Sequence, residues 1–208
     1  MKTTFLNYSA AFSIAIGMLL TACHGHKDST AIADSANQKQ IAQTDSANKA
    51  QVKSSDSALK TKTALLDDAS KFLVKSYESG MYEIQLSQLA ATNSLVADVK
   101  DLAANLVTSH TAINAKISAI AASANFVLPT AVNADHQKDL TDMAKLTGTE
   151  FDKKYIDKII DGHEKSVDSY KDASKNLTVS DTKAFATETL PKIEDHLAMA
   201  KKVKDKIK

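Results

Sequence analysis

The sequence lacks several residue types on which common kinds of protein chemistry depend. Among its 208 residues there is one cysteine, no tryptophan and no arginine, with only five glycines and two prolines. A single cysteine forms neither an intramolecular disulfide nor a zinc site built from several thiolates. Scarce glycine and proline, together with abundant alanine, lysine and leucine, favour helices over a sheet-rich fold.

The absence of arginine also bears on the partners of the protein. Arginine supplies the planar, two-pronged hydrogen bonding that recognises phosphates and base edges, and nucleic-acid binding further requires a basic excess to release counterions. The formal net charge of this chain is only +1 at pH 7. We therefore predict that it has no nucleic-acid partner.

The N-terminus has the pattern of a bacterial lipoprotein signal. Lys2 is followed by a short apolar run, residues 12–20, and then by small Ala22 and the only cysteine, Cys23. The run is shorter than the ~20 apolar residues that a membrane-spanning helix needs. We predict a lipoprotein signal peptide over residues 1–22 and lipidation at Cys23, which consumes the only thiol and excludes catalysis by a thiolate.

A lipid at Cys23 would anchor the mature chain in a membrane of the bacterial cell envelope. The residue after Cys23 is His24 rather than aspartate, which in similar lipoproteins removes one signal for retention in the inner membrane. The predicted location is the outer membrane, facing the periplasm or the cell surface. The first predicted partner is the membrane itself, through the N-terminal lipid.

Residues 23–63 are predicted to form a lipid-anchored, low-complexity tether. They contain few large apolar side chains and cannot bury a core of their own, so the segment is expected to be disordered or transiently helical. The segment repeats Asp-Ser-Ala every eleven residues, starting at Asp34, Asp45 and Asp56. Eleven residues make nearly three helical turns, so a helix that presents the same stripe at each repeat is the alternative.

Residues 64–208 are predicted to form an all-α, ferritin-like four-helix bundle with a short extra helix in the crossover. Apolar residues recur there at spacings of three and four, the periodicity of amphipathic helices. Ser94 and Thr149 are the expected N-caps of the second and third long helices, and Pro191 lies inside the fourth. The predicted helices span residues 67–91, 95–124, 135–145, 151–176 and 180 to the C-terminus.

The apolar stripes of three predicted helices each contain one histidine, His110, His163 and His196. One stripe of the first helix turns Glu83 toward the same interior, whereas a competing stripe through Leu73 and Ile84 leaves Glu83 at the edge. One carboxylate and three imidazoles inside a bundle indicate a metal site or a buried polar network, because an isolated buried charge is costly. Heights counted along the helices spread the four groups further than one ion can bridge.

Core histidines satisfied by serine, tyrosine or backbone partners are the simpler interpretation of these side chains. If a metal binds, a mononuclear, histidine-rich site for zinc, copper or nickel fits the ligands. A di-iron centre is not expected, because ferritin-like di-iron proteins use Glu-x-x-His pairs. The residues three positions before the histidines are apolar instead: Val107, Ile160 and Ile193.

Several spaced motifs in the folded part resemble those of the domain-of-unknown-function 4142 family. The resemblance covers about residues 67–206 and implies a relative of ferritin-like four-helix bundles, often secreted or lipid-anchored in bacteria. The family's usual acidic residue before the second-helix histidine is replaced by Ser109 here. The matching segments are Gly80-Met81-Tyr82-Glu83-Ile84, Ser109-His110-Thr111, Phe151-Asp152-Lys153-Lys154-Tyr155-Ile156 and Leu190-Pro191-Lys192-Ile193-Glu194-Asp195-His196.

Two functions are compatible with these observations. The first is a non-enzymatic binding or structural role in the envelope, through a protein partner or self-association, because the sequence contains no phosphate-binding loop, nucleophile elbow or triad spacing. The second is a metal-binding or redox role that uses Glu83, His110, His163 and His196. Asp152 is expected to cap a helix or to lie on the surface.

Overall fold

The computed structural model describes residues 28–51 and 56–207, and within these residues the chain is helical with no strand. The predicted signal peptide and Cys23 lie outside the described residues, so both stay predictions. The helices are α1 (Ser29–Gln51), α2 (Asp56–Asn93), α3 (Ala97–Ala124), α4 (Ala134–Met143), α5 (Gly148–Asn176) and α6 (Ser180–Lys206).

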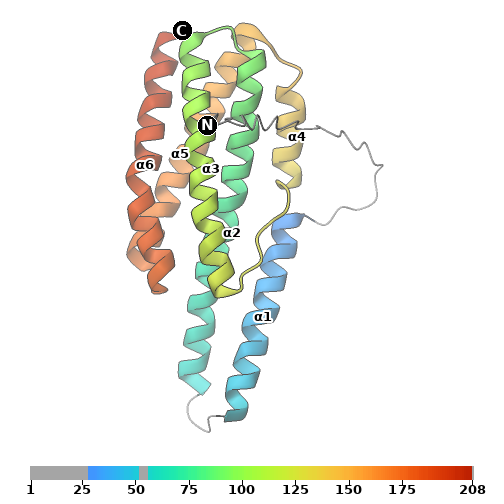
Figure 1. The fold of residues 1–208 in the computed structure, drawn as a ribbon, viewed down its shortest axis with the longest axis vertical. Coiled ribbons are helices and arrows are strands. Elements are labelled where there is room, and N and C mark those ends of the chain that lie inside the picture. Colours follow the sequence, from blue (N-terminus) through green and yellow to red (C-terminus); the bar gives the residue numbers. More distant parts are fainter. Residues whose placement is uncertain (1–27, 52–55, 208) are drawn as a thin grey trace, which may run out of the picture.

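Four of these helices, α2, α3, α5 and α6, form a bundle whose long axis is vertical in Figure 1. α2 packs chiefly against α3, and α5 against α6. The short helix α4 lies in the crossover between α3 and α5, so the predicted helical bundle with an extra crossover helix is confirmed. Its relation to ferritin-like bundles stays a prediction.

The ends of the helices differ in detail from the predicted caps. The helix expected to follow Thr149 begins at Gly148, and its N-cap Thr147 makes no side-chain capping hydrogen bond. Ser94 Oγ accepts a hydrogen bond from the backbone N–H of Val96 and therefore stabilises the turn before α3. Asn125 ends α3 in the left-handed conformation, with φ 56°, which asparagine adopts more readily than most residues.

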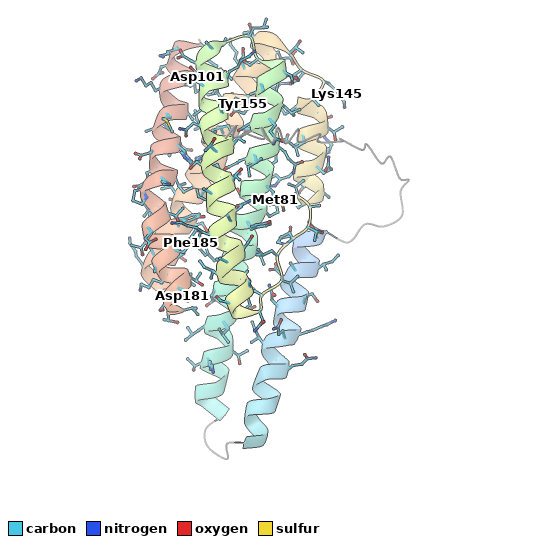
Figure 2. The ribbon with its side chains drawn as sticks, viewed as in Figure 1. Met81, Asp101, Lys145, Tyr155, Asp181 and Phe185 are labelled. Carbon is cyan, nitrogen blue, oxygen red and sulfur yellow. The ribbon has the colours of Figure 1, made fainter. Side chains whose placement is uncertain are left out.

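The interior of the bundle contains two hydrophobic clusters, one above the other. The upper cluster, toward the α2–α3 turn, includes Leu86, Leu106 and Tyr155, and the lower cluster includes Ile113 and Phe185. Figure 2 shows Tyr155 and Phe185 among the helices at these two heights. Both clusters contain residues from all four long helices. Each cluster therefore holds the four helices together at its own height along the bundle.

The segment predicted to be a disordered or transiently helical tether is helical over residues 29–51 and 56–63, and its role as a lipid-anchored tether stays a prediction. α1 runs alongside the lower part of α2, and Ala33, Asn37 and Ile41 on one face of it are buried. The Asn37 side chain donates to the carbonyl of Val127 and accepts from its N–H, so it pairs with the crossover backbone. The helix over residues 29–51 agrees with the helical alternative, whereas the repeated stripe stays a prediction.

The predicted domain limit at residue 64 falls inside a helix, since α2 starts at Asp56. The division into a tether over residues 23–63 and a bundle over residues 64–208 stays a prediction. Among the described residues, no helix is both long and apolar enough to cross a membrane.

Candidate metal centre

One carboxylate and three imidazoles meet at mid-height in the bundle. Glu83, His110, His163 and His196 come from α2, α3, α5 and α6, and each is at most 4% exposed. Apolar residues of the upper and lower clusters lie one turn to either side of each histidine. The prediction that the three histidines face inward is confirmed. The predicted spread in height is wrong, because helix ends read from sequence shifted the levels by several residues.

The three imidazoles present nitrogen atoms to one another. His163 Nε2 lies 3.4 Å from His110 Nε2 and 3.3 Å from His196 Nδ1. One nitrogen from each of the three rings lies within 4.8 Å of the other two. Among the residues that the structure describes, these three alone form such a group of potential metal ligands.

The backbone fixes which nitrogen of His163 faces the cluster. Its Nδ1 lies 2.9 Å from the carbonyl oxygen of Ile159, one turn earlier in α5. A carbonyl only accepts, so we assign the proton to Nδ1, which leaves a lone pair on Nε2. That lone pair points toward His110 and His196. Metal-binding histidines are commonly oriented by such a bond from the other ring nitrogen.

Glu83 lies beside the imidazoles, and only one of its two carboxylate oxygens accepts a hydrogen bond from the described residues. His110 Nε2 donates to Glu83 Oε2 over 2.8 Å. The other oxygen, Oε1, is 3.6 Å from His163 Nδ1 and has no hydrogen-bond partner among the described residues. The alternative stripe, which placed Glu83 at the edge of the bundle, is therefore wrong. A buried carboxylate oxygen without a donor costs free energy that a bound cation would recover.

The protonation states suit metal coordination. Burial raises the pKa of Glu83, but the charges of the three histidines and the hydrogen bond from His110 outweigh burial and lower its pKa to about 2. Burial, followed by the charges of His110 and His163, lowers the pKa of His196 to about 3. An ionised carboxylate and a neutral imidazole are the forms that bind metal ions.

Two of the three nitrogen separations match a tetrahedral ion, and the third is within 4.8 Å. Two nitrogens that each lie about 2.0 to 2.1 Å from one ion at the tetrahedral angle are about 3.3 to 3.4 Å apart. The two measured separations around His163 are 3.4 Å and 3.3 Å. Glu83 Oε2, which lies 2.8 Å from His110 Nε2, would be the carboxylate oxygen beside such an ion. With a single carboxylate and apolar residues at the Glu-x-x-His positions, the site does not resemble a carboxylate-bridged di-iron centre.

A second glutamate–histidine pair lies nearby and was missed in the sequence. Glu78 Oε1 accepts from His136 Nδ1 over 2.8 Å and from the backbone N–H of Asn133, also over 2.8 Å. The His136 ring stacks on Tyr82 with centroids 4.0 Å apart, and Tyr82 donates to Asp139. Burial and the bond to Asp139 raise the pKa of Tyr82. His136 lies on a short helix without a long apolar stripe, so periodicity gave no signal for it.

Two cavities reach the histidine–carboxylate cluster from different sides. A cavity of about 570 Å³ lies among α2, α4 and α5 and has Glu83 and Gly162 in its wall. A second, of about 380 Å³, lies between α3 and α6 and reaches His196. The cluster is therefore buried from bulk water yet is approached by hollows on two sides of the bundle.

Asp152 differs from its predicted role. It is 1% exposed, and neither carboxylate oxygen has a hydrogen-bond partner among the described residues. It is thus neither a surface charge nor a helix cap. It precedes His163 by three helical turns, about 16 Å along the axis, so it does not bond to the histidine cluster.

Comparison with known proteins identifies the bundle. Residues 56–203 match the domain of unknown function DUF4142. The chain belongs to the DUF4142 family. This assignment covers every residue of the histidine–carboxylate cluster and confirms the resemblance found in the sequence motifs.

A solved structure shares the fold of this DUF4142 bundle. It is a DUF305 protein from Streptomyces coelicolor, titled as a secreted protein, and it is 11% identical with a TM-score of 0.57. The match covers 67% of this chain and 92% of that chain. No curated protein matches the chain in sequence.

Proposed function

We propose that this DUF4142 protein binds one divalent transition-metal ion at the centre of its helical bundle. The ligands are His110, His163, His196 and Glu83, each from a different helix. The observation that supports the proposal is the convergence of three imidazole nitrogens within 4.8 Å beside a carboxylate oxygen that lacks a donor. Three imidazoles and one carboxylate favour zinc or copper(II) over a di-iron centre.

The residues of the chain prepare this site in three ways. His163 is oriented by the Ile159 carbonyl, which directs Nε2 to the middle of the cluster. Glu83 supplies one negative charge in a buried environment, where an uncompensated divalent ion would be costly. The apolar clusters above and below restrict water. A bound zinc ion would supply a Lewis acid, and a bound copper ion would supply one-electron chemistry.

The proposed location is the bacterial cell envelope, with a lipid at Cys23 and the bundle facing the periplasm or the cell surface. The lipoprotein-like N-terminus supports this location, and the DUF305 protein that shares the fold is titled as secreted. Attachment to the outer membrane, and a protein partner or self-association, belong to the same proposal.

Metal analysis of the full chain tests the function. The protein is purified in detergent without chelators or a histidine tag, and its zinc, copper, nickel and iron contents are measured as isolated and after reconstitution. We expect about one equivalent of one metal, as in a single four-coordinate site.

The matched variants are His163→Gln and His136→Gln, which change one histidine inside the cluster and one outside it. Metal should be lost from His163→Gln while circular dichroism still shows a helical protein, and it should be retained in His136→Gln. If the parent binds no metal after reconstitution, or if His163→Gln binds as well as the parent, the histidines are core packing and the proposal is wrong.

A further inference from the structure

The two cavities differ in which residue of the histidine–carboxylate cluster lines the inner end of each. In the α2–α4–α5 cavity, the wall includes Glu83, whose Oε1 has no hydrogen-bond partner among the described residues. In the α3–α6 cavity, the cluster residue in the wall is His196, which offers an imidazole and no carboxylate. A buried carboxylate attracts an incoming cation more strongly than a side chain without a negative charge does.

We infer that the α2–α4–α5 cavity is the route by which a divalent transition-metal ion enters and leaves the centre, and that Gly162 keeps the inner end of this route open. The inference rests on the proposed metal site. It adds the route that the ion takes and the residue that keeps this route open. Figure 1 shows that α4 flanks the bundle on one side. The cavity has residues of α4 in its wall, together with residues of α2 and α5.

Gly162 is the residue of α5 that lies against Glu83. A Cβ atom at this position would be 3.2 Å from Glu83 Oε1, closer than ordinary van der Waals contact. Any side chain here therefore narrows the approach to the oxygen that lacks a donor. Glycine in a helix interior lowers helix stability relative to alanine, so the open wall at this position reduces the stability of α5.

The walls of this cavity suit an ion that is losing its water. Ser76 and Ser79 of α2 face the same space as Ser166 and Ser169 of α5, so hydroxyl oxygens are available along it. Charges of both signs line the rest of it: Glu78, Asp135, Asp139 and Asp161 with His136, beside the lysines Lys75, Lys158 and Lys165. One of the lysines, Lys158, is paired with Asp139 over 2.5 Å, which reduces its repulsion of a cation.

Volume alone does not choose between the two cavities. An ion with six waters needs about 200 Å³, at about 30 Å³ per water molecule. The cavities hold about 570 Å³ and about 380 Å³, so both are large enough. In the smaller one, the two charged residues, Lys192 and Asp195, are of opposite sign and exposed. The buried carboxylate therefore decides in favour of the α2–α4–α5 route.

The rate of cobalt(II) loading tests the inference. Metal-free full chain is mixed with Co²⁺ in a stopped-flow instrument, and the visible absorbance of tetrahedral cobalt is followed. Ser166→Phe fills the proposed route, Gly162→Ala narrows its inner end, and Ser109→Phe fills the α3–α6 cavity as the matched control. All four ligands are kept in each variant.

We expect Ser166→Phe to load roughly tenfold more slowly or worse, equivalent to about 1.4 kcal/mol on the barrier, with an unchanged final cobalt content. Gly162→Ala should be slower by a smaller factor, and Ser109→Phe should load at the parent rate. Ser79→Phe, on the facing helix, replaces Ser166→Phe if circular dichroism shows that the latter is misfolded.

Two results would overturn the inference. Parental rates in the filled variant and in Gly162→Ala would exclude this route, and slow loading in Ser109→Phe alone would assign entry to the other cavity. Failure of the proposed function gives a different result, because the parent itself would then bind no cobalt in an equilibrium titration. In that case the proposed route would also be wrong.

Discussion

Two glutamates of α2 each pair with a histidine of another helix, with similar contacts but different surroundings. Glu78 contacts His136 over 2.8 Å, and Glu83 contacts His110 over the same distance. Glu78 Oε1 also accepts from the backbone of Asn133 at the start of α4, so the pair fastens the crossover to α2. Glu83 instead has a second oxygen without a donor, beside two further imidazoles.

The difference shows how the same two residue types serve structure in one place and a ligand site in the other. The side chain of His136 is 32% exposed, and Glu78 Oε1 accepts hydrogen bonds from both His136 and the backbone of Asn133. Around Glu83 the donors and acceptors do not balance, because several imidazole nitrogens face one another. A network with unmatched lone pairs is costly unless something else binds there.

Replacing a histidine by glutamine, inside or outside the cluster, gives the largest expected difference in metal affinity. Outer-sphere partners of metal sites are worth about 10- to 100-fold in affinity, so loss of a direct ligand in His163→Gln should cost roughly 100-fold or more. His136→Gln should leave the affinity within a few-fold of the parent. Competition titration with a chromophoric chelator measures both, and equal losses in the two variants would erase the distinction.

Thermal unfolding with and without metal should show that Glu83, but not Glu78, contributes to metal binding. A ligand present at 100 times its Kd stabilises the folded state by about 2.7 kcal/mol, which raises the Tm of a domain of this size by about 5 to 10 °C. Glu83→Gln should reduce this metal-induced rise because the amide carries no charge. Glu78→Gln should show the full rise, as measured by circular dichroism at 222 nm.

Without metal, both glutamates should stabilise the bundle. Glu78 accepts two hydrogen bonds, and a charged acceptor is worth about 1 kcal/mol more per bond than a neutral one, so Glu78→Gln should lose about 1 to 2 kcal/mol. The pKa of Glu83 is lowered to about 2, so its charge stabilises the folded state at neutral pH and Glu83→Gln should lose at least as much. Urea unfolding of both metal-free variants tests this, and an unchanged stability of Glu83→Gln would contradict it.

The smallest contrast comes from two glycines that differ in their neighbours. A Cβ on Gly80 would lie 2.3 Å from Asn114 Oδ1, so Gly80→Ala must displace a buried side chain and should destabilise the bundle by about 1 kcal/mol or more. Gly162→Ala meets only Glu83 Oε1 at 3.2 Å and should change stability little, with a gain of at most about 1 kcal/mol from helix propensity. Denaturant midpoints of the two variants give the comparison.

The sequence predicted the bundle and the identity of the inward-facing residues well. Steps of three and four in α3, α5 and α6 placed His110, His163 and His196 on buried stripes, and all three are buried. On α2 two stripes competed, because small and polar residues make both faces similar, and only packing placed Glu83 inside. Asp152 was misjudged for a related reason: a charged residue near a helix start is usually a cap, and burial there depends on the neighbouring helices.

Local pattern and tertiary arrangement thus determined different things about this protein. The sequence by itself determined the helices, the class of fold and the residues that face inward, because these follow from periodicity along one helix. Only the tertiary structure decided that four groups from four helices lie at one level, that α1 packs on α2, and that a cavity ends at Glu83. These depend on the relative heights of helices, which loop geometry and side-chain packing set and which shift by about 1.5 Å for every residue of error.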